Sequence, residues 1–140
     1  MNTSQDLVLS FELAHPPAQV WRALTEPALL ERWLMKTDFV LETGHVFQFR
    51  RPATDKWDGV VDCEVLKIEE LRFISYTWRA LGVDTVVSFT LAETATGTRL
   101  TLEQRGFKSD QKQAFFGARG GWAQMVGQAL AGLLNEIGGR

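Results

Sequence analysis

The sequence predicts an α+β fold in which a curved antiparallel sheet wraps around one long C-terminal helix. Apolar and polar residues alternate through several successive segments in the middle of the chain, with short turn sequences between them. This pattern is typical of an antiparallel meander with one solvated face. Near the C-terminus the apolar residues instead recur at helical spacing. We expect residues 1–140 to form a single domain, because a chain of this length buries enough surface for its own core.

The N-terminal part begins with a predicted strand and continues with two predicted helices. Residues 7–13 place Leu or Phe at every second position, which indicates a half-buried strand. In residues 20–33 the apolar residues follow helical spacing, and Pro27 would interrupt one long helix. The sequence therefore predicts two short helices here, with Thr25 as the expected N-cap of the second.

The same alternation predicts further strands, and turn residues such as Asp58-Gly59 and Gly82 separate them. The expected strands cover residues 47–50, 61–66, 73–78, 83–91 and 99–103. The C-terminal helix is predicted from apolar residues that share one side of a helix, namely Trp122, Val126, Ala129, Leu130, Leu133 and Ile137. A curved sheet and a long helix leave space between them, and a small molecule would bind in that space.

Composition and charge exclude several classes of protein. The net charge is −2, and Arg50-Arg51 is the only basic pair, which argues against nucleic-acid binding. Cys63 is the only cysteine, so neither an intramolecular disulfide nor a cysteine-rich zinc site can form. The first residues, MNTSQDL, lack a positive segment followed by an apolar run, and no apolar run is long enough for a membrane span. We therefore expect a cytoplasmic location.

Motifs along nearly the whole chain resemble the family of activator of Hsp90 ATPase homolog-like proteins, within the START-like (SRPBCC, Bet v 1-like) superfamily. The residues that carry the resemblance are Val20-Trp21-Arg22-Ala23-Leu24-Thr25, Pro27, Leu30, Trp33, Trp57-Asp58-Gly59, Tyr76-Thr77-Trp78, Thr85-Val86-Val87-Ser88-Phe89, Gly97-Thr98-Arg99-Leu100 and Gly121-Trp122. The resemblance implies a helix-grip fold with a deep pocket under the C-terminal helix. It leaves the function open, because the superfamily includes lipid carriers, hormone receptors and polyketide cyclases.

The chain is rich in aromatic residues, with nine Phe, five Trp and one Tyr. These rings either fill the core or form the wall of a pocket, and flat rings would stack on an apolar ligand. The residues that we expect to line such a pocket are Trp57, Cys63, Tyr76, Trp78, Phe89, Trp122, Met125, Val126 and Ala129. Cys63 is interpreted as a buried, inert thiol. Glu64 and Gln104 lie in predicted strands; Glu64 is out of phase with its apolar neighbours and is expected in solvent, whereas the direction of Gln104 stays open.

Three functional hypotheses follow. The first is binding of a small hydrophobic ligand, such as a lipid, a polyketide-like molecule or an aromatic metabolite, in the cavity. The second is a cyclase or hydrolase that uses the same pocket, with Tyr76 assisting proton transfer. The third, suggested by the family's name alone, is a stress-related protein that contacts a chaperone. We expect no cofactor and no metal, since His15 and His45 have no second ligand at a suitable spacing. Both a monomer and a homodimer are compatible with the sequence.

Overall fold

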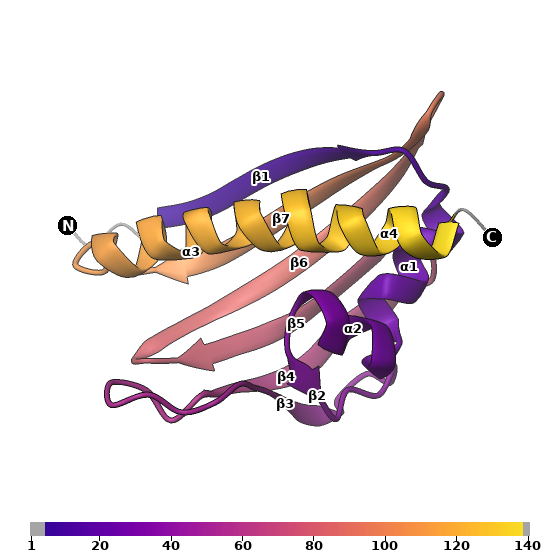
Figure 1. The fold of residues 1–140 in the computed structure, drawn as a ribbon. Coiled ribbons are helices and arrows are strands. Elements are labelled where there is room, and N and C mark those ends of the chain that lie inside the picture. Colours follow the sequence, from indigo (N-terminus) through magenta and orange to yellow (C-terminus); the bar gives the residue numbers. More distant parts are fainter. Residues whose placement is uncertain (1–4, 139–140) are drawn as a thin grey trace.

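The computed structural model describes residues 5–138, which form an antiparallel sheet with all of the helices on one face (Figure 1). The first residues of the chain, on which the localisation prediction partly depends, therefore lie mostly outside the described part. In spatial order the strands are β1, β7, β6, β5, β4, β3 and β2. Their bounds are β1 (Gln5–Leu13), β2 (Lys36–Thr37), β3 (Val46–Arg50), β4 (Val60–Glu69), β5 (Phe73–Ala80), β6 (Val83–Thr94) and β7 (Gly97–Phe107).

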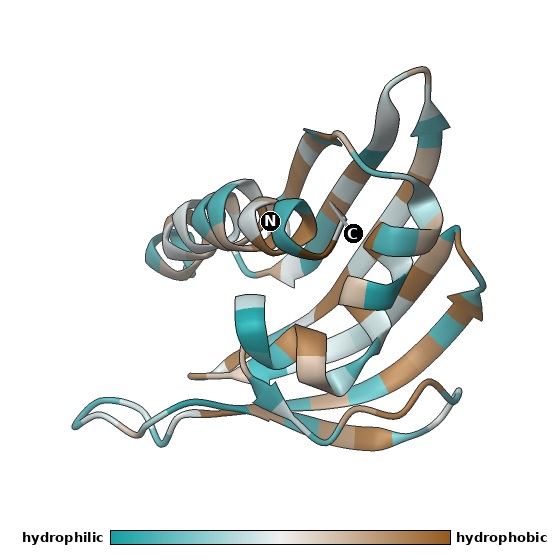
Figure 2. Cartoon of the chain, turned by 45° about the vertical axis from the view of Figure 1, so that its right-hand side comes forward, coloured by the Kyte–Doolittle hydropathy of each residue, from teal (hydrophilic) through white to brown (hydrophobic). Residues whose placement is uncertain are grey.

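This architecture confirms the predicted α+β helix-grip fold. The strands expected from alternation are all present, and apolar and polar bands follow one another along them in Figure 2. In β6 the side chains of Thr85, Val87, Phe89 and Leu91 are buried at every second position, and Ser88 on the other face is buried as well. The short strand β2 was not predicted, because two residues are too few to show a period.

Two short helices follow the first strand, as predicted. They are α1 (Pro17–Thr25) and α2 (Pro27–Trp33). Pro27 opens the second helix because proline has no N–H to lose in the first turn. The indole N–H of Trp33 donates to the backbone oxygen of Ala23 at 2.8 Å, so this buried ring ties the two helices together.

The predicted N-cap role of Thr25 is wrong. Thr25 is the last residue of α1, and its hydroxyl donates back to the carbonyl oxygen of Trp21 at 2.8 Å. The residue that precedes α2 is Glu26, whose side chain makes no capping hydrogen bond. A threonine in the last turn of a helix can bond the carbonyl four residues earlier, and that alternative is satisfied here.

The C-terminal helix runs without interruption through α3 (Lys112–Gln124), the π-helical turn η1 (Met125–Leu130) and α4 (Ala131–Gly138). It therefore begins well before the apolar stripe that predicted it. Four of its buried residues, Trp122, Val126, Leu130 and Leu134, are spaced by four, and Leu133 is buried beside the last of them. In a regular α-helix each such step rotates by about 40° beyond a full turn, and the wider π-helical turn reduces this drift. Ala129 was expected on the same side but is exposed.

Aromatic rings occupy much of the space between the sheet and the helices. The rings of Phe47 and Tyr76 lie 5.3 Å apart between centroids, and those of Trp78 and Trp122 lie 5.1 Å apart. The C-terminal helix thus contacts β5 through the ring of Trp122. Within residues 5–138, no helix is long and apolar enough to cross a membrane.

Burial changes the acidity of two groups in this core. It is the main cause that raises the pKa of the Cys63 thiol, with the carboxylates of Asp62 and Asp38 adding to the effect. Burial also raises the pKa of the Tyr76 hydroxyl well above its ordinary value, with a smaller contribution from Cys63. Both groups are therefore neutral in the folded protein at neutral pH.

These raised pKa values predict a loss of stability in alkali. The unfolded chain ionises its cysteine above about pH 8.5 while the folded chain does not, so each further pH unit costs about 1.4 kcal/mol. Above about pH 10, the ordinary pKa of tyrosine, Tyr76 lowers the folding stability further for the same reason. Urea unfolding of Cys63→Ala between pH 7 and 10, under reducing conditions, is expected to show a flatter pH dependence than the parent protein. Val61→Ala, on the same buried face of β4, should lower stability without changing the slope. Identical slopes in all three proteins would contradict this account.

Candidate ligand-binding site

Two neighbouring cavities lie between the sheet and the C-terminal helix. The inner cavity has a volume of about 290 Å³ and is bounded by β4, β5, β6, β7 and the first half of α3. The outer cavity has a volume of about 810 Å³ and lies between α2, the end of β3 and the helix from Gly121 to Ala129. Among the described residues, Met35 alone lines both cavities.

Aromatic and small side chains form the wall of the inner cavity. The sheet side contributes Trp57, Trp78 and Phe107, and the helix side contributes Ala114, Gly117 and Ala118. A Cβ atom at Gly117 would meet no atom within 4 Å, so the glycine leaves open space that a side chain would fill. Such a wall suits a flat apolar molecule, because aromatic faces stack and small residues leave room for it.

Gln104 brings a polar group to this otherwise apolar wall. Its amide oxygen accepts from the indole N–H of Trp122 at 2.8 Å. Its amide nitrogen donates to the hydroxyl of Thr85 at 3.0 Å, and that hydroxyl donates to the backbone oxygen of Trp78 at 2.9 Å. An indole can only donate, so it fixes which end of the amide faces it. By valence the amide nitrogen then retains one further N–H, and the oxygen retains one further lone pair.

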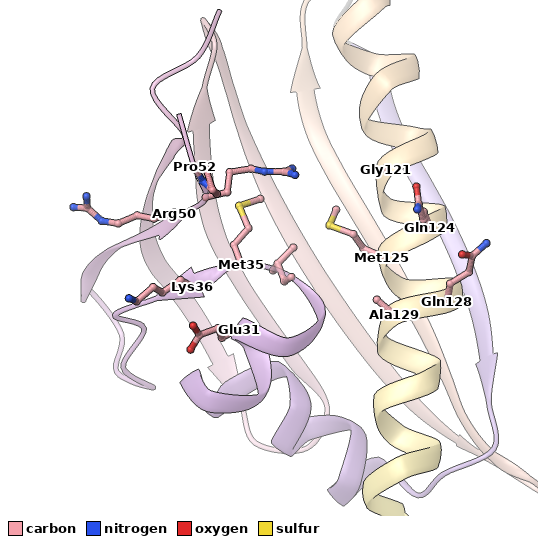
Figure 3. Close-up of a pocket in the computed structure, with 12 residues that line it drawn as sticks. Glu31, Met35, Lys36, Arg50, Pro52, Gly121, Gln124, Met125, Gln128 and Ala129 are labelled. Atoms are coloured by element: carbon pink, nitrogen blue, oxygen red, sulfur yellow. The ribbon is translucent and has the colours of Figure 1, made fainter. Parts of the chain in front are cut away.

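The outer cavity is lined by two methionines and a charged rim. Met35 and Met125 extend toward each other from opposite walls (Figure 3). The rim carries Lys36, Arg50 and Arg51 against the single carboxylate of Glu31, and two glutamines of the helix, Gln124 and Gln128, complete it. In Figure 3 the charged ends of Lys36 and Arg50 point away from the helix, toward the outside of the molecule.

Four of the nine residues expected to line a pocket line one of the two cavities, and five do not. Trp57 and Trp78 line the inner cavity, whereas Met125 and Ala129 line the outer one. The remaining residues are buried in the packed core and line neither cavity, namely Cys63, Tyr76, Phe89, Trp122 and Val126. Trp122 and Phe89 nevertheless pack together, with ring centroids 5.9 Å apart.

Sequence reasoning left Gln104 unresolved and missed Met35. Gln104 lies in phase with the buried Leu100 and Leu102, so its position in β7 was the signal that it points inward. Met35 lies between α2 and β2, where no periodic pattern applies. The basic pair Arg50-Arg51 was noticed, but nothing in the sequence places it beside a cavity.

A sheet wrapped around a C-terminal helix, with cavities between the two, defines a protein of the helix-grip class. A family model for Activator of Hsp90 ATPase homolog 1-like protein matches residues 14–135. The chain belongs to this family, as the motifs predicted. No curated protein matches the chain.

Solved structures of similar proteins show the same fold. Protein MLL2253 from Mesorhizobium loti is 43% identical with a TM-score of 0.88, and the alignment covers 94% of this chain and 98% of that one. Protein BH1534 from Bacillus halodurans is 26% identical with a TM-score of 0.79, covering 94% and 98% of the two chains. DynU16, a protein of the dynemicin biosynthetic locus, is also 26% identical with a TM-score of 0.79, covering 93% of this chain and 47% of that one.

The hydrogen bond between Gln104 and Trp122 predicts a measurable cost when one partner is removed. Gln104→Leu keeps the size of the side chain but leaves the buried indole N–H without its acceptor. We expect it to lower the free energy of unfolding by about 1–3 kcal/mol in urea denaturation.

Two further variants separate this effect from general damage. Gln113→Leu, at an exposed position of α3, should change stability by less than about 0.5 kcal/mol. In the Gln104→Leu background, Trp122→Phe should cost less than it does alone, because the orphaned donor is removed with the ring nitrogen. Strictly additive effects would contradict the assigned hydrogen bond.

Proposed function

We propose that this protein binds a small, largely apolar molecule with a flat ring system in the inner cavity. The observation that carries the proposal is the composition of the wall, where three aromatic side chains face small residues of α3 and Gln104 brings a polar group. Burial of apolar ligand surface would supply most of the affinity, at about 25 cal/mol per Å² before the costs of association.

Gln104 would orient the ligand. Its remaining amide N–H can donate to a hydroxyl, ether or carbonyl oxygen of the ligand. Because the other bonds of the amide are already made to Trp122 and Thr85, the group is held in place before the ligand arrives. A rigid donor in an apolar wall gives selectivity, since a ligand without an acceptor leaves it unused.

Two further observations support a small organic ligand. The superfamily that the motifs resemble includes lipid carriers and hormone receptors, and the resemblance implies a pocket under the C-terminal helix. DynU16, similar over most of this chain, comes from a biosynthetic locus, where small organic molecules are made. A cytoplasmic location belongs to the same proposal, and the single free, buried cysteine is compatible with it.

A pair of glycines in α3 provides the test. Neither Gly117 nor Gly120 has an atom within 4 Å of a new Cβ, but only Gly117 lines the inner cavity. Leucine is a better helix former than glycine, so both Gly117→Leu and Gly120→Leu should fold, each with a helix stabilised by up to about 1 kcal/mol. Isothermal titration with 2-naphthol should show binding to the parent protein and to Gly120→Leu, and affinity at least about tenfold weaker for Gly117→Leu.

The outcomes decide the proposal. A tenfold loss corresponds to about 1.4 kcal/mol, which displaced ring contacts readily supply. Equal affinity of all three proteins for 2-naphthol would place the ligand elsewhere and overturn the proposal. No binding of 2-naphthol to the parent protein would overturn it for flat bicyclic ligands.

A further inference from the structure

We propose that the inner and outer cavities are two halves of one site, that the side chain of Met35 is the movable partition between them, and that the ligand is an elongated amphipathic molecule. Its flat apolar end would occupy the inner cavity, and a tail ending in a carboxylate would extend through the outer cavity to its basic rim. This inference rests on the proposed function and extends it to the outer cavity.

The first support is the position of Met35. It lines both cavities and is almost fully buried. Its backbone is fixed, because its N–H donates to the carbonyl oxygen of Leu30 at 3.1 Å. Its side chain is unbranched and has three rotatable bonds, so it can change rotamer without disturbing the chain around it. A fixed backbone with an adaptable side chain is what a partition between two cavities requires.

The second support is the arrangement of the two cavities along the C-terminal helix. Ala114, Gly117 and Ala118 face the inner cavity, and the next turns, which include Gly121 and Met125, face the outer one. From Gly117 to Met125 the helix rises by about 12 Å. The two cavities therefore follow each other along one helix, and an extended molecule would lie parallel to it.

The third support is the small size of the helix residues beside Met125. A Cβ atom at Gly121 would meet only the terminal methyl of Met125, at 3.9 Å. Met125 begins the π-helical turn, and it faces Met35 across the outer cavity (Figure 3). Each of two opposite walls of the outer cavity thus presents a flexible thioether side chain, and such side chains adapt to ligands of different width.

The charge of the rim indicates the end of the tail. The rim holds three cations, Lys36, Arg50 and Arg51, and one carboxylate, that of Glu31. Within residues 5–138, none of the three cations forms an ion pair with a carboxylate. Their charged ends lie in solvent, so a ligand carboxylate would reach them at the mouth of the cavity and keep much of its hydration. This interaction is expected to be modest and sensitive to salt.

The test compares 2-naphthol with 6-(2-naphthyloxy)hexanoic acid, which adds a carboxylate tail to the same ring. In Met35→Ala the partition is removed, and we expect the ratio of the affinity for the acid to the affinity for 2-naphthol to rise at least about fivefold over the ratio in the parent protein, because Met35 lines both cavities and its loss affects both ligands. In Met35→Phe, which keeps a bulky and stiffer side chain, the acid should bind at least about fivefold more weakly. Leu34→Ala is the matched control, because Leu34 is the neighbouring residue and lines the outer cavity alone.

The results separate this inference from the proposed function. If 2-naphthol fails to bind in the inner cavity, the proposed function fails first. If 2-naphthol binds there but the ratio of the two affinities is the same in the parent protein, Met35→Ala and Met35→Phe, only the partition is overturned. The methyl ester of the acid should bind the parent protein at least about threefold more weakly at low salt. Equal affinity of acid and ester would overturn the carboxylate end of the ligand.

Discussion

The hydrogen bond from the Trp122 indole to Gln104 determines how the C-terminal helix sits on the sheet. Trp122 is a large buried side chain, and its ring lies against Trp78 and Phe89. It therefore holds the helix at the distance of an aromatic side chain from the strands. Space remains on both sides of this contact, and those two spaces are the inner and outer cavities. The C-terminal end of the helix is different, because Leu130, Leu133 and Leu134 are buried there.

The position of the inner cavity explains one of the glycines of α3. Each glycine inside a helix costs roughly 0.5–1 kcal/mol relative to alanine. No close neighbour excludes a Cβ atom at Gly117 or Gly120, so steric crowding does not account for them. Gly117 lines the inner cavity, and a larger side chain at this position would occupy part of that space. At Gly120, which lines neither cavity, the structure offers no such reason.

The sequence was sufficient for the fold because a two-residue period and a helical period leave clear signals. β6 and the stripe around Trp122 were predicted from these periods alone. Thr25 was misassigned because one hydroxyl can cap the next helix or bond the previous turn, and only the backbone geometry decides. The site was harder to predict from the sequence, because a cavity forms only where buried side chains fail to pack against one another, and no periodic pattern reports this. Tyr76 and Trp78 share one strand face, yet Tyr76 is packed in the core while Trp78 lines a cavity.

The proposed function requires that a ligand bind in the inner cavity and contact Gln104 as its polar partner. A crystal structure of the protein with 2-naphthol would show whether this is so. We predict the naphthalene ring beside Trp57 and Trp78, with its hydroxyl oxygen within hydrogen-bond distance of the Gln104 amide nitrogen. A structure in which 2-naphthol is bound elsewhere, with the inner cavity closed by the surrounding side chains, would contradict the account.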